Sequence, residues 1–250
     1  MPSKENDAAA GQAPSVAVGK SLNDEMEITR FSLNFRIQHI VLFTSLIVLG
    51  ITGLSLMFHD NWLATLIIRL EGGVEIRGLI HRVAAVVLIA GSLYHVFYVM
   101  FTEAGHTEFM KLKPGRKDFS DFRQALKFDL GLSDKEPVFE KFDYVQKFQY
   151  GGVVVGVATM IFSGFILWFE TPSMAVVPKW VIDVTLIVHG YEGLLAFLIL
   201  FLWHQYNVHL NPTVFPMDRA WLTGRISLKD LKEKHYLEYE EVVRKSQDNE

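Results

Sequence analysis

The chain has 250 residues, half of them hydrophobic, and a formal net charge of −4 at pH 7. This acidic balance offers no electrostatic basis for binding nucleic acid. The sequence contains no cysteine, which excludes iron–sulphur clusters, disulfides and covalently attached c-type haem on this chain. Any redox chemistry must therefore use non-covalent cofactors held by histidine or methionine.

The apolar residues are concentrated in four long runs. Residues 1–30 precede them and contain no apolar core long enough for a signal peptide, so we expect a disordered cytoplasmic tail. Since about 20 apolar residues cross a bilayer as one helix, each run is long enough to span. We predict transmembrane helices at about residues 37–58, 79–101, 148–169 and 181–208. A shorter apolar piece, residues 62–70, is too short to span.

The fold class is therefore all-α, an integral membrane four-helix bundle over residues 31–210 with a cytoplasmic loop and tails. Lysine and arginine set its orientation, because positive charge collects on the cytoplasmic side. The two termini and the loop at residues 102–147 together hold 20 of these residues, whereas the two opposite connections hold 3. We expect both termini to be cytoplasmic, including the C-terminal tail, residues 211–250.

Four histidines stand inside the predicted helices. His81 and His95 are fourteen residues apart in the second helix, and His189 and His204 are fifteen apart in the fourth. At 3.6 residues per turn both spacings keep the two imidazoles on roughly one face. A lone histidine in a membrane can simply bond a carbonyl, but four at two matched depths suit two stacked bis-histidine haems. A haem iron with a neutral imidazole on each side transfers electrons without binding oxygen.

The inner pair has a competing candidate, because His39 lies at the same depth as His95 and His204. Two haems need only four ligands, and the helical spacing favours His95, which faces the same way as His81. His39 would then bond a haem propionate or a quinone oxygen. Arg82 follows His81, and its guanidinium could either bind a propionate or extend to the membrane rim.

Four segments resemble the bacterial four-helix dihaem cytochrome b family, which includes the membrane b subunits of nickel–iron hydrogenases, formate dehydrogenase and thiosulphate reductase. RIQHIVLFTSLIVLGITG is similar to the first helix of that family and GLIHRVAAVV to the second. FDYVQKFQYGG is similar to the start of the third, and VHGYEGLLAFLILFLWHQY to the fourth. The resemblance covers residues 30–225 and implies a quinone-linked transmembrane electron carrier.

The resemblance also implies ligand sets. The formate dehydrogenase pattern assigns the outer haem to His81 and His189 and the inner haem to His39 and His204. Two features depart from that pattern: His95 has no counterpart, and the fourth-helix spacing is fifteen rather than fourteen, which turns the second imidazole by about 100°. Pairing His95 with His204 resembles instead the scheme of cytochrome bc-type proteins. We favour His95 slightly and keep both alternatives.

The resemblance further implies an inner quinone site before the third helix, where Asp143 and Gln146 occupy matching positions. Alternatively, Asp143 and Gln146 belong to an ordinary polar helix end and bind no quinone.

The predicted function is that of a dihaem b-type cytochrome subunit with two non-covalent haem b groups. It would transfer electrons across the bacterial inner membrane between the quinone pool and a partner redox subunit, such as a multihaem cytochrome or an iron–sulphur protein. As such it would serve a membrane-bound quinone oxidoreductase complex without itself holding the primary catalytic site. The alternatives are a stand-alone quinone-reactive cytochrome b and a haem-free transporter that uses intramembrane histidines.

Overall fold

The computed structural model describes residues 26–135, 137–212 and 214–248. These residues form two compact units. The bundle unit contains residues 33–95 and 148–221. The polar unit contains residues 26–32, 96–147 and 222–248.

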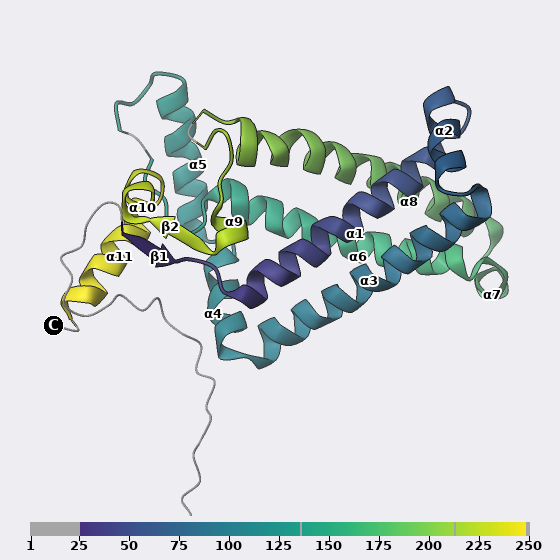
Figure 1. Ribbon diagram of the computed structural model, residues 1–250, viewed down its shortest axis with the longest axis horizontal. Helices are drawn as coiled ribbons and strands as arrows, with labels where there is room; N and C mark the ends of the chain where they lie inside the picture. The colour runs from purple at the N-terminus through teal and green to yellow at the C-terminus, as the bar shows by residue number, and fades with distance from the viewer. Residues whose placement is uncertain (1–25, 136, 213, 249–250) are drawn as a thin grey trace, which may run out of the picture. The chain divides into compact units, whose positions relative to one another are not determined.

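Within the described residues, four helices are long and apolar enough to cross a membrane (Figure 1). They are α1 (Leu33–Met57), α3 (Val74–Phe101), α6 (Tyr144–Trp168) and α8 (Lys179–Leu198). Helix α8 continues as two π-helical segments, η1 (Ile199–His204) and η2 (Tyr206–Leu210). The predicted all-α membrane bundle is confirmed.

Three of these helices begin four or five residues earlier than the sequence predicts. Helix α1 starts at Leu33 rather than near residue 37, and its first turn contains Arg36. Helix α3 starts at Val74 rather than near residue 79, and α6 starts at Tyr144 rather than near residue 148. Their first turns contain charged residues such as Glu75 and Lys147, which an apolar run leaves out. Because backbone hydrogen bonds propagate a helix whatever the polarity of its side chains, all three helices begin before their apolar stretches.

Short helices join the long ones at one end of the bundle. The apolar piece at residues 62–70 forms α2 (Trp62–Leu70), which starts where the Asn61 side chain accepts a hydrogen bond from the Leu63 amide. Gly72 and Gly73 follow with φ of 98° and 94°, a left-handed conformation that favours glycine. They turn the chain from α2 into α3. Helix α7 (Glu170–Met174) joins α6 to α8.

The remaining elements are short. They are β1 (Glu27–Thr29), α4 (Glu103–Leu112), α5 (Arg116–Asp129), α9 (Ala220–Thr223), β2 (Arg225–Ser227), α10 (Leu228–Lys234) and α11 (Tyr236–Gln247). Strands β1 and β2 pair antiparallel, with Ile28 opposite Ile226. Of the predicted disordered tail, residues 1–25 lie outside the described residues, whereas residues 27–29 form β1.

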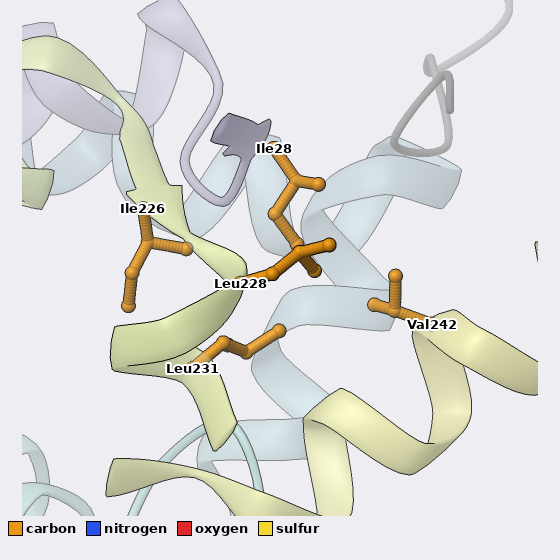
Figure 2. Close-up of a cluster of buried hydrophobic side chains, with 5 residues drawn as sticks. All are labelled: Ile28, Ile226, Leu228, Leu231 and Val242. Carbon is orange, nitrogen blue, oxygen red and sulfur yellow. The ribbon is translucent and has the colours of Figure 1, made fainter. Parts of the chain in front are cut away.

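The core of the polar unit is a cluster of aliphatic side chains, shown in Figure 2. It consists of Ile28, Ile226, Leu228, Leu231 and Val242. Strands β1 and β2 supply one side of this cluster, and α10 and α11 supply the other. Because these elements come from the two ends of the described chain, the core ties both ends into one unit.

His235 lies between α10 and α11 and is buried in the polar unit, with 7% of its surface exposed. Its Nδ1 lies 2.9 Å from the carbonyl oxygen of Glu140 and donates to it. Burial, and then the nearby charge of Arg30, lower the pKa of His235 to about 4. The folded unit therefore holds this imidazole neutral.

The first prediction concerns this imidazole. Between pH 6.5 and 4 the unfolded chain binds a proton at His235 and the folded unit does not, so stability is present above this range and lost as the pH falls. At about 1.4 kcal/mol per pKa unit, the loss is on the order of 3 kcal/mol. It can be measured as hydrogen exchange of the β2, α10 and α11 amides, corrected for the intrinsic pH dependence of exchange.

His235→Gln should flatten this pH dependence. His106→Gln, at an exposed histidine of α4, should leave it as in the wild type. Equal pH dependence in wild type and His235→Gln would assign the acid sensitivity to other groups.

Candidate functional site

One pair of imidazoles faces each other between α3 and α8. The ring centroids of His81 and His189 are 6.4 Å apart, with an interplanar angle of 68°. Both residues are half-buried. The Nδ1 atom of His81 lies 2.8 Å from the hydroxyl of Thr52 on α1, and that of His189 lies 2.8 Å from the hydroxyl of Ser163 on α6. All four long helices therefore contribute to this pair.

A second pair joins α1 to η1. The ring centroids of His39 and His204 are also 6.4 Å apart, with an interplanar angle of 51°. The Nδ1 atom of His39 is buried and has no hydrogen-bond partner among the residues that the structure describes. Phe43 and Trp221 pack on the His39 ring at centroid distances of 5.8 and 5.7 Å.

The other ring of this pair is held by an amide. Nδ1 of His204 lies 3.0 Å from Nε2 of Gln149 on α6. Because the two ends of an amide are nearly isosteric, a 180° turn of this group would present its oxygen to an Nδ1–H instead. Gln149 can therefore support either tautomer of His204.

His95 has a different environment from the four histidines of the two pairs. Its Nδ1 lies 2.8 Å from Oε1 of Gln38, which accepts when Nδ1 carries the proton. Its Nε2 lies 3.0 Å from the Tyr150 hydroxyl, which can donate to it. Both ring nitrogens are thus engaged by side chains. This arrangement favours His39 over His95 as the partner of His204, the opposite of what helical spacing suggests.

His204 follows His189 by fifteen residues rather than fourteen. The π-helical segment η1 explains how His204 nevertheless faces His39. In a π-helix each backbone hydrogen bond spans one more residue than in an α-helix. A wide turn between His189 and His204 therefore takes in the extra residue and cancels most of the roughly 100° rotation that it would otherwise cause. His204 itself ends η1.

The geometry of both pairs fits one metal ion between two imidazoles. Metal–imidazole bonds are about 2 Å long, so two ligand nitrogens on opposite sides of an ion are about 4 Å apart and the ring centroids about 6 Å apart. Both observed separations are 6.4 Å. Each pair offers two ligands, and the planar ring of a porphyrin supplies the other four of a six-coordinate iron.

The spacing between the pairs follows from α1. Thr52, which contacts His81, is thirteen residues after His39 on this helix. At 1.5 Å per residue the two pairs are about 20 Å apart along the helix axis. This is a large part of the roughly 30 Å hydrocarbon thickness of a bilayer, so the pairs lie at two distinct levels of the bundle.

The sequence model of the prokaryotic cytochrome b561 family matches residues 30–215. The chain belongs to this family. It is accordingly a membrane protein and a b-type cytochrome, whose haem b serves electron transfer. Comparison with the curated proteins gave no significant match.

In this cytochrome Arg82 and a second arginine, Arg77, lie near the His81 end of α3. Arg82 is exposed, and its guanidinium carbon lies 5.7 Å from the ring centroid of Trp168. Arg77 is only 8% exposed and donates through Nη1 to the Thr52 carbonyl at 2.6 Å. Sequence reasoning missed Arg77, although it precedes His81 by four residues and so shares its helix face.

Asp143 and Gln146 form a reciprocal cap at the start of α6. Oδ1 of Asp143 accepts from the Gln146 amide at 2.7 Å, and the Asp143 amide donates to Oε1 of Gln146 at 3.2 Å. This is the geometry of a capping box, which satisfies amides at a helix start. Burial raises the pKa of the Asp143 carboxyl. The structure thus gives both side chains a local role in starting the helix.

The second prediction tests the π-helical turn of the cytochrome. Deleting Leu202 from η1 shortens the spacing of His189 and His204 from fifteen residues to fourteen. A regular α-helix would then present both imidazoles on one face, and if His39 and His204 hold a haem, that haem should be retained. Inserting one alanine between Leu202 and Trp203 adds about 100° and should remove that haem. Haem b content and low-spin absorbance of the purified variants measure both outcomes; loss of haem in the deletion together with retention in the insertion would contradict the mechanism.

Proposed function

We propose that this cytochrome binds two haem b groups, one between His81 and His189 and the other between His39 and His204. The observation that carries the proposal is the equal 6.4 Å separation of two imidazole pairs at two levels of one bundle. Ferric and ferrous iron between two imidazoles differ by one electron without a change of ligands. The protein supplies the ligands and the apolar surroundings that keep oxygen and water away from the iron.

The choice of His39 over His95 rests on available lone pairs. A ligating imidazole needs one nitrogen free to bind the iron. Gln38 and Tyr150 engage both nitrogens of His95, so ligation would have to break at least one bond in a half-buried site. No such bond has to break at His39 Nδ1, and its ring already faces His204.

We further propose that the protein carries electrons across the bacterial inner membrane, between the quinone pool and a partner redox subunit. Two redox centres about 20 Å apart along α1 would provide a path through most of the hydrocarbon layer. The excess of lysine and arginine in the termini and the central loop supports cytoplasmic placement of both ends. A multihaem cytochrome or an iron–sulphur protein is the proposed partner, since this chain has no cysteine for a cluster of its own.

Three finer assignments remain proposals of the same kind. Arg82 is the proposed propionate-binding residue, and Arg77 is a second cation at the same end of α3. Asp143 and Gln146 are the proposed quinone-binding residues, and their capping role does not depend on that function. Membership of the cytochrome b561 family argues against the haem-free transporter, and an optical spectrum of the purified protein tests this directly.

The third prediction concerns haem content. The purified protein should contain two non-covalent b haems, both low-spin, that acid acetone extracts and a pyridine haemochrome assay counts. His81→Ala and His189→Ala should each lose one haem, and His39→Ala and His204→Ala should each lose the other, because a single imidazole binds iron far more weakly than a pair.

His95→Ala is the matched control, since it removes a membrane histidine at the depth of His39. It should keep both haems at full low-spin absorbance. The opposite result, with haem kept in His39→Ala and lost in His95→Ala, would replace His39 by His95 as the ligand.

The fourth prediction concerns the partner. Solubilised from native membranes in a mild detergent, the cytochrome should co-purify with at least one further redox subunit. Identification of the associated chains by mass spectrometry, together with their metal content, measures this. Recovery solely as a homo-oligomer that still reacts with quinone would support the stand-alone cytochrome.

A further inference from the structure

The His81–His189 pair is held by the same arrangement twice. On α1 the hydroxyl of Thr52 contacts Nδ1 of His81, and on α6 the hydroxyl of Ser163 contacts Nδ1 of His189, both at 2.8 Å. Thr52 is 2% exposed and Ser163 is 4% exposed. Water therefore has little access to either contact, and each hydroxyl is the group that satisfies its imidazole.

The direction of these hydrogen bonds follows from the single proton of a hydroxyl. Thr52 donates to the carbonyl of Val48 at 2.7 Å, and Ser163 donates to the carbonyl of Thr159 at 2.7 Å. Toward the imidazole each hydroxyl can then only accept, so each Nδ1 carries a proton. A neutral imidazole protonated at Nδ1 keeps its lone pair on Nε2. Both rings are thus set to bind iron through Nε2.

The residue after each hydroxyl is a glycine that lies against the same ring. A Cβ on Gly53 would be 3.5 Å from Cε1 of His81, and a Cβ on Gly164 would be 3.3 Å from Cε1 of His189. The second distance is tighter than ordinary contact, so a side chain there would press on the ring. A Thr-Gly dipeptide on α1 and a Ser-Gly dipeptide on α6 therefore make equivalent contacts with the two imidazoles.

We propose that Thr52 and Ser163 are positioning residues for the haem between His81 and His189. They hold both imidazoles in the Nδ1–H tautomer and in one orientation, which keeps Nε2 available to the iron. By accepting a hydrogen bond from Nδ1–H they also make each imidazole a stronger electron donor, which favours ferric over ferrous iron and lowers the midpoint potential. The proposal rests on the proposed function, in that this pair must bind haem.

The test is a redox titration of the purified dihaem protein, with the electron paramagnetic resonance spectrum of each oxidised low-spin haem recorded in parallel. Thr52→Val keeps the shape of the side chain and removes the acceptor, and Ser163→Ala does the same on α6. Each should raise the midpoint potential of one haem and shift its g values. A tenfold change in the preference for ferric iron corresponds to about 59 mV, and we expect a shift no larger than this.

Two further variants separate hydrogen bonding from packing. Thr52→Ser retains the hydroxyl and should return both the potential and the g values to those of the wild type. Ser45→Ala removes another buried hydroxyl of α1, which donates to the Val41 carbonyl at 2.7 Å. It should change neither quantity, because the contacts of His81 do not include it.

Unchanged potentials and g values in both Thr52→Val and Ser163→Ala would overturn the proposal. If Thr52→Val does not accumulate, Ser163→Ala decides the same question at the other imidazole. Failure of the proposed function looks different, because His81→Ala and His189→Ala would then both keep the haem content of the wild type. In that case the hydroxyls would have no haem to tune, whatever the state of the imidazoles.

Discussion

The bundle depends on how imidazole nitrogens are satisfied in an apolar interior. A buried polar group without a partner costs free energy comparable to a lost hydrogen bond, so each histidine constrains the helix opposite to it. Thr52 ties α1 to α3, Ser163 ties α6 to α8, and Gln149 ties α6 to η1. Among the imidazole nitrogens of the described residues, Nδ1 of His39 is the one that is buried without a hydrogen-bond partner.

The two units differ in the kind of side chain that they bury. In the polar unit the core is aliphatic, and Leu228 and Leu231 are 1% and 0% exposed. In the bundle unit many large apolar side chains face outward, while small hydroxyl residues such as Ser45 and Thr52 are buried between helices. Lipid is as apolar as leucine, so membrane helices associate through close packing of small residues and through hydrogen bonds rather than by burying oily surface.

The π-helical turn shows how one inserted residue can be tolerated in a helix that carries paired histidines. An extra residue in a regular α-helix would rotate everything beyond it by about 100° and would move His204 away from His39. The wide turn of η1 absorbs that residue between His189 and His204. Such turns recur at functional sites because they redirect a side chain without breaking the helix.

The sequence by itself determined the membrane character, the number of long helices and the positions of the histidines, because apolar runs and residue spacing are local properties of a chain. It could not decide between His39 and His95. Their environments depend on Gln38 and Tyr150, which lie 57 and 55 residues from His95, and on a π turn that apolar periodicity does not reveal. The pairing of β1 with β2 was equally hidden, since Ile28 and Ile226 meet only when the two ends of the described chain fold together. Contacts between residues distant in sequence arise from the packing of whole elements, so only the tertiary structure could settle them.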